Sequence, residues 1–248
     1  PKRGLIYDTN MEVLAQTKEV ATIIMAPSEI PDEATRTLIA DELSVLLEIN
    51  RDALYKKTGK KSSLYEVIKA KIDHSLCDTF IDWVQEHQFT GIFRVIQDYK
   101  REYPMNNLLS SVLGFVGSDN LAKEGLEVKY DEVLSGTPGR LVTALNAWGD
   151  ELPTRLPYEN TVDAEDGYSL VLTVDQNIQQ VVEKYLEEAI NEYAAKNRGA
   201  AIVMDVQTGA ILAMATKKDY NPNDYLTIAD PDVAAQIALL MAGVAMLC

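Results

Sequence analysis

The stretch from residue 168 to residue 216 constrains the fold more than any other part of the chain. It begins with YSLVLTV, an apolar run with the composition of a strand. Asp175 is a good N-cap for residues 176–196, where apolar side chains recur at helical spacing. GAAIVMDV and AILAMAT, joined by QTG, then predict a hairpin with a glycine-containing turn. We therefore expect a strand, a long amphipathic helix and a hairpin.

The first 150 residues predict short, mixed elements. GLIYDTNMEVLA indicates strand, turn and strand, and VATIIMAP is a second β-rich run. Residues 31–49 predict a helix, and a short basic helical piece follows it. A capping box at residues 63–66 predicts another helix through LYEVIKAKI. The later expectations are a helix in CDTFIDWVQEH, a strand in IFRVIQDYKREYP, a short helix in NNLLSSVLGFVG, a helical KEGLEVKYDEVLSG, a hairpin in RLVTALNAWGDELP with its turn at residues 146–149, and a loop in YENTVDAEDG.

These elements predict an α+β fold with a domain break in the loop near residues 153–167. We expect an extended mixed domain over residues 1–155 and a truncated α/β start over residues 156–248. The apolar fraction of 47% is that of a globular protein. The formal net charge of -15 argues against a nucleic-acid partner, because phosphate backbones attract basic surfaces.

The two ends of the chain have the pattern of cut edges. PKRGLIYDTN lacks the apolar run of a signal peptide. The most apolar segment, residues 237–248, is shorter than the roughly 20 residues that cross a bilayer. We therefore expect a piece of a longer protein.

A metal site is one interpretation of His74, Cys77 and His87, which follow the pattern H-x2-C-x9-H. Zinc sites use four ligands, or three and a water, and the pattern specifies no fourth ligand. Asp78 or Asp82 would have to supply it. Ordinary helix side chains are the simpler interpretation, so neither a metal nor a cofactor is expected.

Two triplets raise the question of a serine active site. S-D-N at residues 118–120 and K-T-G at residues 57–59 are two of the three signatures of penicillin-interacting serine enzymes. The third, S-x-x-K, places a lysine one helical turn from the nucleophile, and no serine in the chain has that lysine. We therefore expect no catalytic residue, and we expect Ser118 or Asp119 to cap the helix that follows.

Five stretches, taken in chain order, carry a family resemblance. They are RGLIYD with Asn10, then REYP before LLSSVLGFVG, then EGLE with YD and LSG, then LTVDQNIQ, and finally GAAIVMDVQTGAILAMA with NPN. Together they resemble class B penicillin-binding proteins, the monofunctional D,D-transpeptidases of bacterial cell-wall synthesis, most of all the sporulation and division types. Thr9 and Met11 depart from that pattern, where a basic residue and a glycine are usual.

The residues that carry the resemblance are expected to be structural. They are Arg3, Gly4, Tyr7, Asp8, Arg101, Tyr103, Pro104, Gly114, Gly117, Gly125, Glu127, Tyr130, Asp131, Gly136, Asp175, Gln179, Asp205, Gly209 and Asn223.

The resemblance implies a dimerisation or pedestal domain to residue 155 and the start of a transpeptidase domain after it. The parent protein would be anchored by a membrane helix, lie on the extracytoplasmic face, act on peptidoglycan stem peptides and be acylated by β-lactams. This chain would position the catalytic part and contact division or sporulation proteins, with a homodimer as one option. Two alternatives stay open: a stand-alone interaction module, and an unrelated hydrolase that uses His74 or His87.

Overall fold

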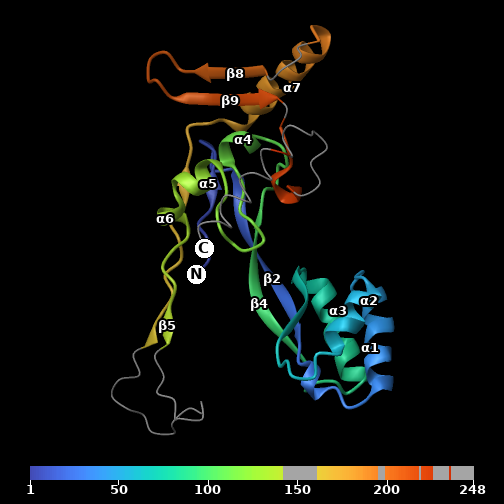
Figure 1. Cartoon of the computed structure of the whole chain (residues 1–248). Helices are drawn as coiled ribbons and strands as arrows, with labels where there is room; N and C mark the ends of the chain where they lie inside the picture. Colours follow the sequence, from blue (N-terminus) through green and yellow to red (C-terminus); the bar gives the residue numbers. More distant parts are fainter. Residues whose placement is uncertain (142–160, 195–198, 218, 226–234, 236–248) are drawn as a thin grey trace. The chain divides into compact units, whose positions relative to one another are not determined.

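The computed structural model describes residues 1–141, 161–194, 199–217 and 219–225, together with residue 235 (Figure 1). The chain forms two compact units. Unit 1 consists of Pro1–Thr17 and Arg101–Cys248, and unit 2 of Lys18–Lys100. The domain break expected near residue 155 coincides with neither boundary of unit 2, and it stays a prediction.

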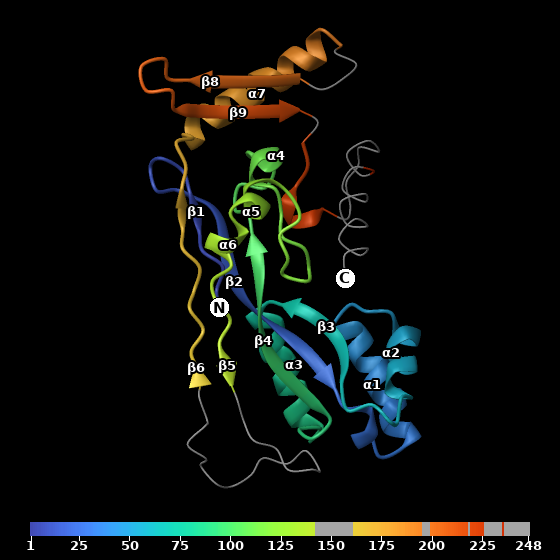
Figure 2. The ribbon, with the colours of Figure 1, turned by 60° about the vertical axis from the view of Figure 1, so that its left-hand side comes forward.

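Unit 2 packs three helices against a small sheet, in which β2 pairs with both β3 and β4 (Figure 2). Ile23, Leu43 and Phe80 are among the side chains of its core. The elements are β2 (Val13–Met25), η1 (Pro27–Glu29), α1 (Glu33–Leu46), α2 (Arg51–Thr58), β3 (Glu66–Ile72), α3 (His74–Glu86) and β4 (Phe93–Glu102), of which β2 and β4 also extend into unit 1.

The amphipathic helices of unit 2 are confirmed. Asp32 caps α1 by accepting a hydrogen bond from the Thr35 amide at 2.7 Å. α3 buries Phe80 and Val84 on one face, and the Phe80 ring meets Phe93 of β4 edge-on at 5.4 Å between centroids. The helical period in the sequence is therefore a sound guide where the apolar stripe is long.

The helix expected through LYEVIKAKI is wrong, because residues 66–72 form strand β3, antiparallel to β2. Ser63 closes its own turn and caps no helix. Ile68 and Ile72 are both buried, and a spacing of four fits a helical and an alternating pattern equally. In so short a window the backbone partners that β2 supplies decide the conformation.

Unit 1 has a second core, formed by Ile6, Leu14, Phe115, Leu134 and similar side chains. β1 pairs antiparallel with β2 and parallel with β7, and α7 packs on the β8–β9 hairpin (Figures 1 and 2). The elements are β1 (Ile6–Tyr7), α4 (Ser110–Leu113), α5 (Gly125–Lys129), α6 (Asp131–Leu134), β5 (Arg140–Leu141), β6 (Thr161–Val162), β7 (Leu170–Val171), α7 (Gln176–Glu192), β8 (Gly199–Met204), β9 (Ile211–Lys217) and η2 (Pro222–Asp224).

The expected strand, long helix and hairpin are present, with shorter bounds for the strand and the helix. Two other expectations need correction. The loop expected at residues 158–167 contains β6, which pairs with β5, and the single helix expected up to Gly136 breaks at Tyr130. The hairpin turn expected at residues 146–149 and the apolar tail at residues 237–248 lie outside the described residues.

The turn between β1 and β2 explains why glycine suits position 11. Met11 has a φ of 66° and an exposed side chain, so its backbone is in the left-handed region that favours glycine. Met11→Gly is expected to raise the free energy of unfolding by about 0.5–1 kcal/mol, measured by denaturant titration. Glu12→Gly, one residue on and outside that region, should instead lower it. A loss of stability in Met11→Gly would contradict the prediction.

Candidate functional site

The carboxylate of Glu127, which lies on the first turn of α5, is fully buried between two guanidinium groups. Arg3 Nε donates to its Oε2 at 2.6 Å, and Arg101 Nε donates to its Oε1 at 2.7 Å. The Tyr103 hydroxyl donates to Oε1 at 3.3 Å. Both oxygens are therefore occupied, and the carboxylate is held in place by charge-assisted bonds.

The remaining nitrogens of these arginines join segments far apart in the sequence. Arg3 Nη1 donates to Asp131 at 2.6 Å and Nη2 to the Glu127 carbonyl at 2.7 Å. Arg101 Nη1 donates to the Gly4 carbonyl at 2.7 Å. Arg101 Nη2 is buried with no partner among the described residues, so that guanidinium depends on Glu127 for its counter-charge.

Thr17 belongs to the same cluster, and sequence reasoning missed it. Its hydroxyl donates to the Arg3 carbonyl at 2.9 Å and lies 3.3 Å from Arg101 Nη1. Thr17 lies outside every motif that carries the resemblance. An isolated threonine within a long β-rich run gives no signal that separates it from an ordinary strand residue.

Protonation states follow from this environment. Burial raises the pKa of the Tyr103 phenol, and the charge of Glu127 adds to the effect. Burial and Glu124 likewise raise the pKa of Tyr220. Burial alone would lower the pKa of the Arg3 guanidinium, but Glu127 and Asp131 outweigh it and the pKa is raised. Arg3 therefore keeps its charge, and Tyr103 and Tyr220 stay neutral, over a wide pH range.

The free energy of unfolding is expected to fall as the pH rises above about 10, the ordinary pKa of tyrosine. There the unfolded chain releases the protons of Tyr103 and Tyr220, while the folded chain retains them. Replacing both by phenylalanine should flatten the slope of stability against pH by about 2.7 kcal/mol per pH unit. Denaturant titrations across this range would measure it. Tyr65 and Tyr185, both exposed, are the control pair, and an equal effect from them would contradict the prediction.

A second group of motif residues fixes the start of α7. Asp8 is buried, and its Oδ1 accepts from the amides of Asn10 and Glu12 at 2.8 Å each. Its Oδ2 accepts from the Gln176 amide at 3.1 Å. Asp175 caps the helix as predicted and also accepts from Asn10 Nδ2 at 3.0 Å. The β1–β2 turn is thereby tied to the helix N-terminus.

The side-chain amides of Gln179 and Asn223 each bond to both backbone groups of one distant residue, as a neighbouring strand would. Gln179 is buried, and its Oε1 and Nε2 pair with the amide and carbonyl of Met214 at 2.8 and 2.9 Å. Asn223 does the same with both backbone groups of Tyr103, at 2.9 Å each. These bonds attach α7 to β9, and η2 to the end of β4.

Two of the motif glycines, Gly114 and Gly125, lie where chain segments touch. Gly114, with φ of 73°, would place an added Cβ 1.9 Å from the Glu124 carbonyl oxygen, and Gly125 faces it.

The last group of motif residues is not brought into the cluster. Gly117 lies beside Asp119 and Lys123, and Gly136 lies beside the Glu165 carbonyl. Asp205 and Gly209 lie in the β8–β9 turn. Tyr7 is half-buried in β1, whereas Pro104, after β4, and Tyr130, between α5 and α6, are exposed.

The S-D-N triplet forms a turn, but it caps no helix, so that expectation is wrong. Asp119 accepts from the Leu121 amide at 3.1 Å and pairs with Lys123 at 2.6 Å. The Ser118 amide donates to the Tyr225 hydroxyl at 2.9 Å. The N-cap of α5 is Glu124, whose side chain makes no capping hydrogen bond.

The K-T-G triplet and His87 also have structural roles. Lys57 Nζ donates to the Val67 carbonyl at 2.7 Å, at the end of α2. His87 closes α3, with its Nδ1 2.9 Å from the Trp83 carbonyl oxygen and its Nε2 3.3 Å from Glu42. Burial raises the pKa of the Cys77 thiol. Within the described part of the chain, no three candidate ligands gather around a metal position.

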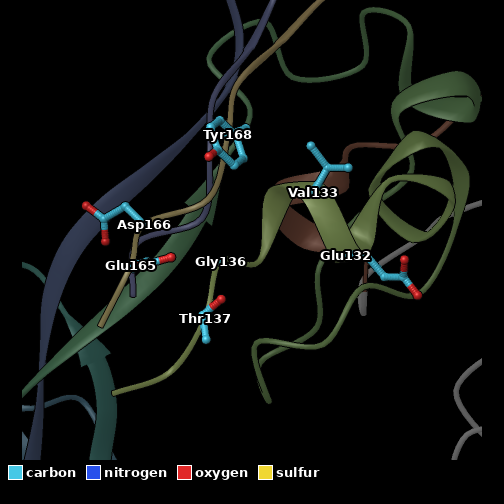
Figure 3. Close-up of a pocket in the computed structure, with 7 residues that line it drawn as sticks. All are labelled: Glu132, Val133, Gly136, Thr137, Glu165, Asp166 and Tyr168. Atoms are coloured by element: carbon cyan, nitrogen blue, oxygen red, sulfur yellow. The ribbon is translucent and has the colours of Figure 1, made fainter. Parts of the chain in front are cut away.

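A hollow of about 480 Å³ opens beside α6 (Figure 3). Glu132, Glu165 and Asp166 line it, but Figure 3 shows that the carboxylates of Glu132 and Asp166 point in opposite directions. The acidic groups do not converge, so the hollow is not a cation site. The candidate site is therefore the Arg3–Glu127–Arg101 cluster, in which the Glu127 and Arg101 side chains are buried.

A family model decides the affiliation: the model described as the Penicillin-binding Protein dimerisation domain matches residues 1–172. The chain belongs to this family. The resemblance to class B penicillin-binding proteins is thus confirmed, and so is the mixed α+β fold class. The matched range ends at the C-terminal side of β7 and contains Arg3, Arg101 and Glu127.

Named relatives agree with this affiliation. Stage V sporulation protein D of Bacillus subtilis is 29% identical over 94% of the chain, which spans 34% of that protein. Peptidoglycan D,D-transpeptidase FtsI of Buchnera aphidicola is 31% identical over 90% of the chain, or 38% of that protein. The chain thus spans about a third of the length of the relatives that it matches.

Solved structures of penicillin-binding proteins share the fold. A complex of PBP2 and MreC from Helicobacter pylori matches with a TM-score of 0.66 and 25% identity, over 91% of this chain and 43% of that one. Penicillin Binding Protein 2X of Streptococcus thermophilus matches with a TM-score of 0.63 and 22% identity, over 92% and 36%.

Proposed function

We propose that this chain is the non-catalytic positioning part of a peptidoglycan D,D-transpeptidase. The observation that carries the proposal is the closed state of the Glu127 carboxylate, whose two oxygens accept from Arg3, Arg101 and Tyr103. A fully buried carboxylate used in that way holds segments together and is closed to a substrate. Relatives that match most of the chain are named peptidoglycan D,D-transpeptidases. We take their reaction as the one to which this scaffold contributes.

In the full protein a serine would attack the D-Ala-D-Ala amide of a stem peptide and form an acyl-enzyme. Backbone N–H groups would stabilise the tetrahedral oxyanion, and an acceptor amine would release the acyl group. β-Lactams would acylate the same serine. No serine of this sequence is followed three residues later by lysine, so we expect this chain to perform none of these steps.

Labelling with a fluorescent penicillin tests the proposal. The chain should carry no covalent label, whereas a longer product of the same gene that includes an S-x-x-K segment should be labelled. Excess unlabelled β-lactam is the control, because it must abolish specific labelling. A penicillin-sensitive label on residues 1–248 alone would overturn the proposal.

The stand-alone interaction module is the less favoured alternative, because relatives that match most of the chain are named peptidoglycan D,D-transpeptidases. The gene beyond codon 248 separates the two. A downstream S-x-x-K supports the transpeptidase, and an immediate stop codon supports the module. The hydrolase alternative is weakened by His87, whose two ring nitrogens face Trp83 and Glu42 within the fold.

We place the full protein on the extracytoplasmic face of the membrane, in contact with division or sporulation proteins. The Helicobacter pylori PBP2 structure with MreC supports such contacts. Among the described residues, no helix is both long enough and apolar enough to cross a bilayer. Co-purification of the full protein with division proteins from membranes tests the placement, and recovery in the soluble cytoplasmic fraction would contradict it.

A further inference from the structure

The loop that leads from α2 to β3 in unit 2 presents two adjacent apolar side chains to solvent (Figure 2). Leu64 is 64% exposed and Tyr65 is 62% exposed. Single exposed apolar residues are common on protein surfaces, but an adjacent pair within a lysine-rich loop is not explained by that rule. Leucine enters the apolar part of a bilayer, and tyrosine favours its interface with water.

The charge around this loop is opposite to that of the chain as a whole. Residues 51–66 contain five basic and two acidic side chains, whereas the chain carries a formal net charge of -15. Lys56 and Lys61 are exposed, and the Lys60 side chain is 56% exposed. An excess of lysine beside exposed apolar groups is typical of surfaces that bind anionic lipids, because each attracts a different layer of the membrane.

Backbone hydrogen bonds hold the loop in shape. The Ser63 amide donates to the Lys60 carbonyl at 2.8 Å, and the Lys61 amide donates to the Gly59 carbonyl at 2.9 Å. The Ser28 amide donates to the Ser63 carbonyl at 3.1 Å, which ties the loop to η1. A loop that is already ordered loses less conformational entropy when it binds, so its few side chains suffice for a weak surface contact.

Three acidic side chains near the loop already have partners. Glu66 pairs with Lys60 at 2.9 Å. Asp32 caps α1 at the positive end of the helix dipole, and Glu33 pairs with Arg36. These contacts offset the carboxylate charges, so the remaining lysines give the loop its positive character.

We propose that residues 59–65 bind the surface of an anionic phospholipid bilayer. Leu64 and Tyr65 enter the interface, and the neighbouring lysines face the lipid phosphates. A soluble polyanion would engage the lysines alone, whereas a bilayer engages the lysines and both apolar side chains. The contact adds to any anchor helix of the full protein and does not depend on one.

Vesicle flotation with the 248-residue chain tests the proposal. The chain should float with vesicles of phosphatidylcholine and phosphatidylglycerol, but not with vesicles of phosphatidylcholine alone. Binding should weaken as salt is added, because ions screen the attraction between lysine and phosphate. Leu64→Ser combined with Tyr65→Ser should lower the partition coefficient about tenfold or more. Lys56→Gln combined with Lys61→Gln should lower it about fivefold for each lysine.

Matched variants separate the loop from general surface effects. Val45→Ser removes a more exposed apolar side chain from α1 of the same unit. Lys129→Gln combined with Lys184→Gln removes the same charge from exposed positions of unit 1. Neither control should change binding by as much as twofold. Circular dichroism of every variant establishes that it is folded.

An environment-sensitive fluorophore gives an independent readout, in a Cys248→Ser background with Cys77 buried. Attached at Ser62→Cys, its emission should shift to the blue when anionic vesicles are added, and attached at Val45→Cys it should not. Equal shifts at both positions would overturn the proposal. So would a chain that floats with neither kind of vesicle, which would favour an acidic protein as the partner.

Competition with soluble polyphosphate distinguishes a bilayer from phosphate groups alone. Polyphosphate should only partly displace the chain, because it offers nothing to Leu64 and Tyr65. Complete displacement, together with unchanged binding of the variant that carries Leu64→Ser and Tyr65→Ser, would show that the loop recognises phosphate alone and would overturn the proposal.

Discussion

Glu127→Gln is expected to lower the free energy of unfolding by about 3–5 kcal/mol. Glutamine keeps the volume of the side chain but removes the negative charge that Arg3 and Arg101 share. Its amide group is also a donor, and it would face a guanidinium donor at one of the two oxygen positions. Arg101 would then lack a counter-charge, and Arg3 would keep only the partly exposed Asp131. Urea titration with two spectroscopic probes measures the change.

Asp131→Asn is the matched control. Asp131 accepts from the same arginine at 2.6 Å, but its side chain is 47% exposed. Solvent screens such a pair, so the loss should stay within about 1 kcal/mol. Equal losses for the two variants would show that the burial of Glu127 does not set the energy of the cluster.

Gly114→Ala is expected to cost about 2–5 kcal/mol, as the sum of two effects. The left-handed backbone at φ of 73° disfavours any residue with a Cβ. In addition, that Cβ would lie 1.9 Å from the Glu124 carbonyl oxygen, so the turn leading into α5 must move. Because Glu127 is on the first turn of α5, the shift should weaken the cluster as well.

Two other glycines separate these effects. Gly209 also has a positive φ, of 77°, but has no heavy atom within 4 Å of an added Cβ, so Gly209→Ala reports the backbone cost alone. Gly91 is equally open and lies outside the left-handed region, so Gly91→Ala should be nearly neutral. If Gly114→Ala costs no more than Gly209→Ala, the contact with Glu124 is not limiting.

Local patterns predict the helices well and the strands less well. α1, α3 and α7 have long apolar stripes and recognisable N-terminal residues, so their existence follows from the sequence. β3 does not, because its seven residues fit two periods and β2 decides between them. β6 is two residues long within a loop-like composition, and only its pairing with β5 identifies it.

The Arg3–Glu127–Arg101 cluster shows a different limit of prediction from the sequence. The resemblance points to Arg3, Arg101 and Glu127 as separate motif residues, but nothing in the sequence indicates that they meet. Arg3 and Glu127 are 124 positions apart, and their contact depends on the tertiary fold. Charge counting in a chain of net charge -15 also conceals a locally balanced, buried group.

Unit 2 begins within β2 and ends within β4, and two residues just outside it are bonded to each other. Gln16 Nε2 donates to Glu102 at 2.7 Å. Lys18–Lys100 is therefore a segment inserted between two neighbouring parts of unit 1, Pro1–Thr17 and the stretch that begins at Arg101. Arg3, Thr17, Arg101 and Glu127 all lie outside it. A change in the length or sequence of this segment would consequently leave the ion pairs of Arg3, Arg101 and Glu127 within unit 1 unaltered.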